Sequence, residues 1–260
     1  MTVFPNVKLN LGLRVLGKRP DGFHELESLF IPYDGFRDEL TIVPAPEFSI
    51  EIDGPCYRGW DPSEDLTARA WRLMRDEFGI DPVRICLTKN SPVGAGLGGG
   101  SSDGAFALRA LNDIFSLGLS DSTLADLAAR LGSDCPFFIY NRPMFVTGRG
   151  DVLEPFDIDL SPFRIEVAVP AGVSVSTKEA YAGLDAPTVI PNAVKESIKA
   201  SLSLPPEQWR GRLVNDFERS VFPAHPEIAA LKEEFYRRGA IYASMSGSGS
   251  AVFALFPANS

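Results

Sequence analysis

Five glycines fall within the seven residues 94–100, and a helix-like pattern follows them directly. Glycine has no Cβ, so such a run lets backbone N–H groups converge on one point and permits positive φ. From Ser101 to Phe115, apolar residues recur at roughly helical spacing. A glycine loop that opens onto a helix N-terminus favours anions, because unpaired N–H groups and the positive end of the helix dipole meet there. We therefore predict a phosphate-binding loop in preference to a flexible connector.

The residues around this loop argue against two well-known classes of nucleotide-binding loop. A Walker loop requires Gly-Lys-Ser/Thr, and no lysine follows these glycines. Residues 94–99 do satisfy G-x-G-x-x-G, the fingerprint of dinucleotide-binding proteins. That motif requires a strand after its helix, whereas residues 120–131 form a second helical pattern. The sequence thus argues against a dinucleotide-binding fold.

Composition excludes several other classes. The chain has 260 residues and a formal charge of −9, which argues against general nucleic-acid binding. Its three cysteines, Cys56, Cys86 and Cys135, are scattered and fit free thiols in a reducing cytosol. Only two histidines are present, which disfavours a histidine-based metal site, and no apolar run reaches the length of a membrane span. We expect a soluble cytoplasmic protein and leave its oligomeric state open.

Strand and helix patterns alternate without a strict βαβ order, which predicts an α+β fold. Apolar residues alternate from Val7 to Val15, so Lys8 and Asn10 project from the polar face of the first strand. The other expected strands are 23–31, 39–43, 48–52, 83–88, 163–169 and 251–256, and the other expected helices are 65–78, 120–131 and 228–238. A Pro-rich, acidic stretch at 154–162 places the expected boundary between two domains, residues 1–155 and 156–260.

Three segments, taken in order, resemble the three motifs of the GHMP kinases. They are Lys8–Leu11, the loop from Pro92 to Gly104, and the Gly/Ser-rich run Ser244–Ser250. The segment Val15–Leu26, which contains Asp-Gly-Phe-His, and the segment Leu131–Phe138 extend the likeness over nearly the whole chain. Within the family, the chain is most similar to the branch that acts on a cytidylated methylerythritol.

The resemblance implies a two-domain GHMP-kinase fold with its active site in the cleft between an N-terminal ATP-binding domain and a C-terminal substrate-side domain. It implies ATP and Mg²⁺ as cofactors, with no metal ligand identified, and phosphoryl transfer to the 2-hydroxyl of the substrate. Lys8 and Asp134 then form the catalytic pair, in which Asp134 receives the hydroxyl proton and Lys8 keeps it ionised. The resemblance places the ATP phosphates against Val93, Gly94, Ala95, Gly96, Leu97, Gly98, Gly99, Gly100, Ser101, Ser102 and Asp103.

On the substrate side, the resemblance places Phe23 and His24 against the cytosine and Asn10 along the substrate pocket. We expect Tyr181 to supply the second face of an aromatic sandwich around the base. Asp65 stands where many members have an asparagine that frames the adenine pocket. Two alternatives remain: another GHMP kinase, acting on mevalonate phosphates or homoserine, and a nucleotide-binding regulator without catalysis. The Asp21–His24 segment argues against the first, and the presence of both Lys8 and Asp134 argues against the second.

Overall fold

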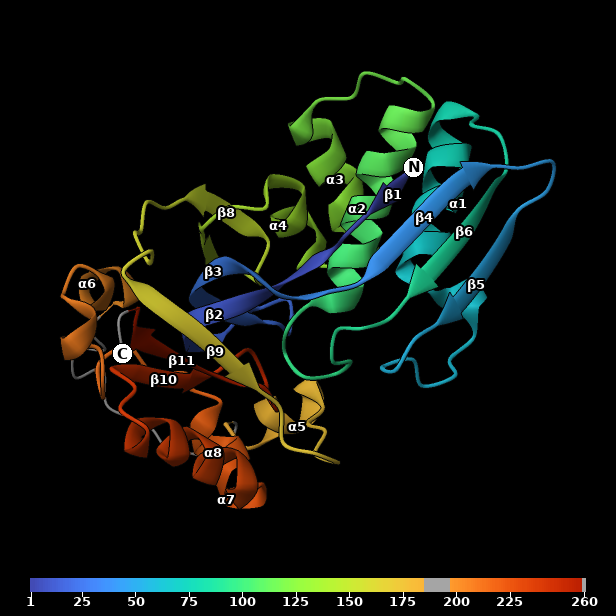
Figure 1. Ribbon diagram of the computed structural model, residues 1–260. Helices are drawn as coiled ribbons and strands as arrows, with labels where there is room; N and C mark the ends of the chain where they lie inside the picture. The colour runs from blue at the N-terminus through green and yellow to red at the C-terminus, as the bar shows by residue number, and fades with distance from the viewer. Residues whose placement is uncertain (185–196, 259–260) are drawn as a thin grey trace. The chain divides into compact units, whose positions relative to one another are not determined.

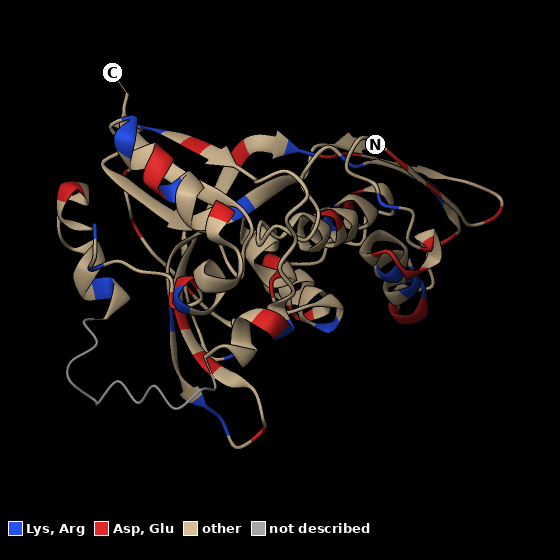
Figure 2. Ribbon diagram, turned by 90° about the horizontal axis from the view of Figure 1, so that it is seen from below, with Lys and Arg blue, Asp and Glu red and all other residues tan. Residues whose placement is uncertain are grey.

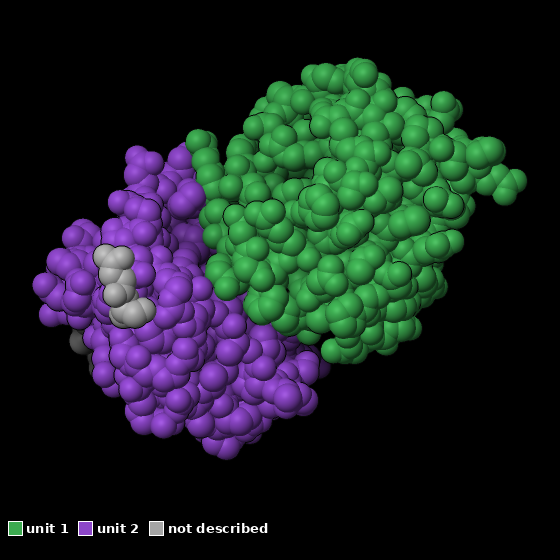
Figure 3. Space-filling model, viewed as in Figure 1, with its two compact units in different colours: residues 1–8, 32–93, 98–142 green, residues 9–31, 94–97, 143–260 purple. Residues whose placement is uncertain are grey.

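The computed structural model describes residues 1–184 and 197–258. They form two compact units, and neither is continuous in sequence (Figure 3). The first unit contains residues 1–8, 32–93 and 98–142, and the second contains 9–31, 94–97 and the described residues from 143 onward. This division differs from the expected single boundary after residue 155. Two long strands, β2 and β3, contribute residues to both units.

The first unit combines one mixed sheet with four helices (Figure 1). Its strand order is β1-β4-β6-β5, in which β4 pairs antiparallel and β5 parallel with β6. The alternating residues Leu40, Ile42, Ile85 and Leu87 are buried on one face of the sheet. Its elements are β1 (Thr2–Val3), β4 (Glu39–Pro44), β5 (Ser49–Asp53), η1 (Pro62–Glu64), α1 (Leu66–Phe78), β6 (Val83–Thr88), α2 (Gly99–Ile114), α3 (Asp121–Leu131) and α4 (Cys135–Tyr140).

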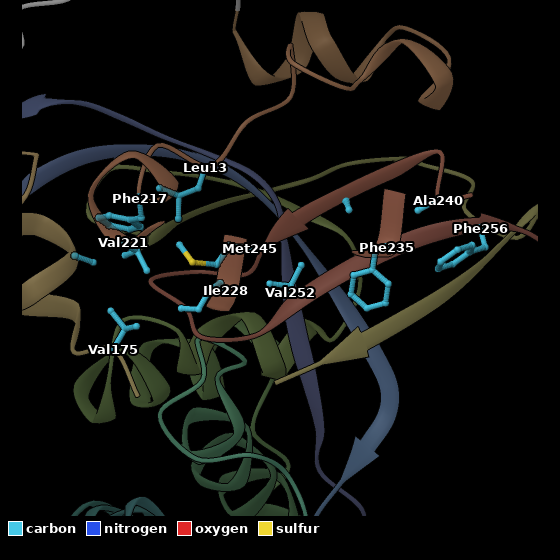
Figure 4. Packing of buried hydrophobic residues seen from close by; sticks show 13 residues of the cluster. Leu13, Val175, Phe217, Val221, Ile228, Phe235, Ala240, Met245, Val252 and Phe256 are labelled. Carbon is cyan, nitrogen blue, oxygen red and sulfur yellow. The ribbon is translucent and has the colours of Figure 1, made fainter. Parts of the chain in front are cut away.

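The second unit contains two sheets, with strand orders β2-β3-β7-β8 and β10-β11-β9. Figure 4 shows a buried cluster in which Phe235 of α8 and Val221 of α7 pack with residues of β10 and β11 such as Met245 and Val252. Its elements are β2 (Asn6–Lys18), β3 (His24–Arg37), β7 (Met144–Thr147), β8 (Val152–Pro155), β9 (Phe163–Ala168), α5 (Thr177–Ala182), α6 (Ile198–Leu202), η2 (Pro206–Gln208), α7 (Glu218–Ala224), α8 (Pro226–Arg237), β10 (Tyr242–Met245) and β11 (Val252–Pro257).

The α+β class predicted from the sequence is confirmed, and a helix rather than a strand follows α2. The helix α1 ends at Gly79, whose φ of 67° lies in the left-handed region that glycine commonly adopts at helix C-termini. The sequence analysis did not predict the helix α4 or the short strands β1, β7, β8 and β10. Within the described residues, no helix is both long and apolar enough to cross a bilayer. Figure 2 shows acidic and basic residues interleaved along the helices rather than gathered into one basic stripe.

Candidate active site

The glycine loop connects β6 to α2 and uses a repeated left-handed backbone. Gly94, Gly96 and Gly98 have φ of 70°, 76° and 72°, a conformation that residues with a Cβ rarely adopt. Gly98 is the N-cap of α2, and no side chain makes a capping hydrogen bond there. The expected arrangement of a glycine loop leading into a helix N-terminus is therefore confirmed, and the first N–H groups of such a helix have no partner within it.

The protein packs closely around Gly96 and Gly99 of the loop, leaving no room for a side chain, but it leaves space beside Gly100. A Cβ on Gly96 would lie 2.2 Å from the carbonyl oxygen of Ser246, and one on Gly99 would lie 2.6 Å from Ser91 Oγ. A Cβ on Gly100, in contrast, would meet no described atom within 4 Å, and Gly100 is exposed in the first turn of α2. Packing within the described part of the protein therefore does not require a glycine at position 100.

The expected loop residues differ in exposure. Val93, Gly94 and Gly100 are exposed, and Gly96, Gly98 and Ser101 are half-buried. The remaining five, Ala95, Leu97, Gly99, Ser102 and Asp103, are buried. The eleven predicted residues are therefore not equally accessible from solvent.

The structure brings together the two residues expected to be catalytic. Lys8 Nζ, on β2, lies 3.6 Å from Asp134 Oδ2, at the N-terminus of α4. Lys8 is 4% exposed, and burial lowers its pKa, while the charge of Asp134 and a hydrogen bond to it act in the opposite direction. A Cβ on Gly98 would lie 3.2 Å from Lys8 Cγ. The ion pair of Lys8 and Asp134 therefore lies beside Gly98, the N-cap residue of α2.

A buried polar network that the sequence analysis did not identify supports the same loop. Lys89 Nζ, at the end of β6, forms ion pairs with Asp38 and with Asp103 in the first turn of α2. Asp38 Oδ1 also accepts hydrogen bonds from the backbone N–H groups of Asn90 (2.6 Å) and Ser91 (2.7 Å). Burial raises the pKa of Asp103 well above its usual range, although Lys89 opposes the shift. Lys89 is adjacent to the loop in sequence, and a lysine buried between two carboxylates links β6 to α2.

The third motif contacts the loop within the second unit. Ser246 Oγ donates to the carbonyl oxygen of Gly96 at 3.1 Å, and the backbone N–H of Asn10 donates to Ser246 Oγ at 3.2 Å. The side chain of Asn10 is buried and donates to Ser28 Oγ at 3.0 Å. The expected substrate residue Asn10 and the Gly/Ser-rich turn are therefore neighbours of the first half of the glycine loop.

Aromatic side chains meet near the tip of the β2–β3 hairpin. Phe23 is 54% exposed, which argues against a core role, and the guanidinium of Arg149 lies 4.9 Å from its ring centroid. Tyr181 stacks on His24, with ring centroids 4.4 Å apart and an interplanar angle of 17°. The structure thus pairs Tyr181 with His24, whereas the sequence analysis expected it opposite Phe23.

Comparison with known proteins places the chain in a family. The model of the GHMP kinases N terminal domain matches residues 65–142, and that of the GHMP kinases C terminal matches residues 198–260. The chain belongs to the GHMP kinase family. A 4-diphosphocytidyl-2-C-methyl-D-erythritol kinase from Bacteroides thetaiotaomicron is 46% identical over 98% of this chain and 92% of that protein. One from Cytophaga hutchinsonii is 45% identical over the same shares of the two chains.

Solved structures agree with this assignment. A crystal structure of 4-(cytidine 5'-diphospho)-2C-methyl-D-erythritol kinase matches with a TM-score of 0.79 and 33% identity, covering 98% of this chain and 90% of that one. A mevalonate kinase from L. major, in complex with R-mevalonate, matches with a TM-score of 0.73 at 16% identity, covering 98% and 87%. At that identity the second likeness concerns the fold alone.

Proposed function

We propose that this kinase transfers the γ-phosphoryl group of ATP to the 2-hydroxyl of 4-diphosphocytidyl-2-C-methyl-D-erythritol, a step of isoprenoid precursor biosynthesis. The observation that carries the proposal is the ion pair of Lys8 and Asp134 beside Gly98, at the open N-terminus of α2. It combines an acid–base group with a backbone anion site. The 46% identical relative named for this substrate supports the choice of acceptor.

The residues suit phosphoryl transfer, which depends mainly on positioning and on electrostatic stabilisation. Asp134 accepts the proton of the substrate hydroxyl as the phosphoryl group is transferred. Lys8 pairs with that carboxylate and stabilises charge at the attacking oxygen. The backbone N–H groups at the start of α2 hold the ATP phosphates. Burial lowers the pKa of Lys8, and the neighbouring charge of Asp134 acts in the opposite direction.

Mg²⁺ would enter with ATP, since nucleotide phosphates supply several of its ligands in kinases. Within residues 1–184 and 197–258, no group of three or more His, Cys, Asp or Glu side chains could hold a metal by itself. Ser102 Oγ is buried in the first turn of α2 and has no hydrogen-bond partner among the described residues. We assign it as the hydroxyl available to the ion. Bound Mg²⁺ would neutralise charge that develops on the phosphates.

On the substrate side, we assign Phe23 as the stacking surface for cytosine. His24, Tyr181 and Asn10 then line the rest of the pocket for the cytidylated substrate. The three cysteines are free thiols, which supports our expectation of a cytoplasmic enzyme.

The position of the transferred phosphate tests this function directly. In a 2-C-methyl tetritol, the carbon that bears the 2-hydroxyl carries no hydrogen. A phosphomonoester at that oxygen therefore shows no three-bond coupling to a proton on its carbon. We expect ³¹P NMR of the product to show one uncoupled monoester signal and an intact diphosphate. A monoester signal split by coupling to protons would place the phosphate on another hydroxyl and contradict the proposal.

Gly100→Ala should weaken nucleotide binding without harming the fold. The added methyl group meets no protein atom within 4 Å, and alanine raises helix propensity by about 1 kcal/mol over glycine. We therefore expect a melting temperature that is unchanged or raised and a dissociation constant for ADP that is higher by about tenfold or more. Gly118→Ala is a control for backbone strain at an exposed glycine outside the loop: its φ of 66° should make alanine lower the melting temperature, while ADP affinity stays as in wild type. An unchanged ADP affinity in folded Gly100→Ala would place the phosphates elsewhere.

Phe23→Ala should affect one substrate selectively. Base stacking on an aromatic ring contributes about 1–3 kcal/mol, so we expect the KM for the cytidylated substrate to rise about 5- to 150-fold. The KM for ATP and the melting temperature should stay close to wild type, because Phe23 is more than half exposed. Phe23→Tyr retains the ring and should be tolerated. Equal increases in both KM values, together with a lower melting temperature, would indicate a structural role for Phe23.

A further inference from the structure

The segment Asn215–Glu218 was not identified by the sequence analysis, yet it contacts both the third family motif and the strand β2. Asn215 is 1% exposed, and its side-chain amide donates to the carbonyl oxygens of Met245 (2.8 Å) and Gly247 (2.7 Å). Its Oδ1 accepts from the backbone N–H of Phe217 at 3.0 Å. Both donor hydrogens of the amide are used, each on a carbonyl group of the third-motif turn.

The backbone that carries Asn215 is fixed on β2. The N–H of Leu13 donates to the carbonyl oxygen of Val214 (3.0 Å), and the N–H of Asp216 donates to that of Leu13 (2.8 Å). Asp216 Oδ2 also accepts from the N–H of Val15 at 2.9 Å, and its Oδ1 pairs with Arg14 at 3.2 Å. The backbone on both sides of Asn215 is therefore held on β2 by hydrogen bonds, so the Asn215 side chain has a fixed starting point from which to hold the turn.

Glu218 holds the same turn from the side of β10. Its Oε1 accepts from the N–H of Met245 at 2.9 Å, and its Oε2 pairs with Lys232 at 2.6 Å. Met245 is consequently bound through its N–H by Glu218 and through its carbonyl by Asn215. The backbone at the start of the turn has little freedom to move.

The turn 245–247 packs directly against the first half of the glycine loop. Ser246 Oγ donates to Gly96 O, and the N–H of Ala251 donates to Ala95 O at 3.0 Å. The two backbones approach so closely that a Cβ on Gly96 would lie 2.2 Å from Ser246 O, and one on Gly247 would lie 3.0 Å from Gly96 O. Packing this close transmits displacement, so a shift of the turn moves Gly96 as well.

We propose that Asn215 is a positioning residue of the nucleotide site, which acts through the turn 245–247 on the backbone of Gly96. The proposal rests on the function given above only in that the glycine loop binds the phosphates of ATP. Asn215 does not touch the nucleotide. It fixes the carbonyl groups of the turn, the turn fixes Gly96, and the loop then presents its N–H groups in the geometry that phosphate requires.

The test compares ADP binding by calorimetry in wild type, Asn215→Ala, Asn215→Asp, Ser246→Ala and the double variant Asn215→Ala/Ser246→Ala. Asn215→Asp keeps the side-chain shape but places an oxygen opposite the two carbonyl groups. We expect each single variant to raise the dissociation constant of ADP by between about tenfold and a hundredfold, because small misplacements of a binding group cost that much. The double variant should bind ADP no more weakly than the single variant with the larger loss, since both residues act on the same loop.

Leu202→Ala is the control for general destabilisation, because Leu202 is buried in α6 of the same unit. It should lower the melting temperature while leaving ADP affinity as in wild type. ADP affinity within twofold of wild type in the folded Asn215 variants would overturn the proposal, as would fully additive effects in the double variant. If Asn215→Ala does not fold, Asn215→Asp and Ser246→Ala decide it by the same criterion. Failure of the wild type to bind ADP would instead contradict the proposed kinase function.

Discussion

Asp134→Asn is expected to lower kcat by a factor of about 10²–10⁴ while ATP binding is retained. Asparagine has nearly the same shape but cannot take the hydroxyl proton from the substrate. It also leaves Lys8, which lies 3.6 Å away and is buried, without its carboxylate partner. Turnover under saturating substrates, together with a separate ADP titration, gives the two quantities required.

A matched control is available on the neighbouring helix α3. Asp126→Asn removes one exposed carboxylate outside the site and should leave both turnover and ADP affinity unchanged. Turnover of Asp134→Asn close to that of the control would remove Asp134 from the mechanism. A loss of ADP affinity in step with kcat would show that the carboxylate acts in nucleotide binding rather than in proton transfer.

Lys89→Met is expected to reduce the free energy of unfolding by about 3–5 kcal/mol, because it leaves two buried carboxylates without their cation. Asp38 and Asp103 both pair with Lys89, and all three side chains are buried. Asp103→Asn removes the surplus negative charge of the network and should be close to neutral. Added to Lys89→Met, it should restore part of the lost stability. Urea denaturation of the four proteins measures these differences.

The same network predicts a pH dependence with a defined sign. Burial raises the pKa of Asp103 in the folded state above its unfolded value, so the native protein retains a proton that the unfolded chain releases. This contribution is complete below the unfolded pKa and is lost as the pH rises through the folded one. Asp103→Asn should therefore remove part of the decline in stability with rising pH. An identical pH profile in the variant would contradict this assignment.

The glycine loop and its helix were predictable because their causes are local in sequence. Alternate glycines permit the left-handed backbone at residues 94, 96 and 98, and the helical period of α2 is carried by its own residues. The helix α4 was missed because its six residues are too few for a period to be read.

The polar residues that support the loop were missed for a different reason. Lys89 lies 51 residues from Asp38 in sequence, and Asn215 lies 30 residues from Met245. A lone lysine or asparagine in a polar stretch is typical of solvent exposure, and only the folded chain reveals its buried partner. The two units are discontinuous in sequence because β2 and β3, strands of 13 and 14 residues, contribute to both of them.

The proposed activity of this GHMP kinase requires a cytidylated substrate. ADP release measured side by side with 4-diphosphocytidyl-2-C-methyl-D-erythritol, mevalonate phosphates and homoserine tests it most directly. We predict that the cytidylated methylerythritol alone supports rapid ADP release and that free CDP inhibits the reaction in competition with it. Turnover of a mevalonate phosphate or homoserine at a higher kcat/KM than the cytidylated compound would contradict the account.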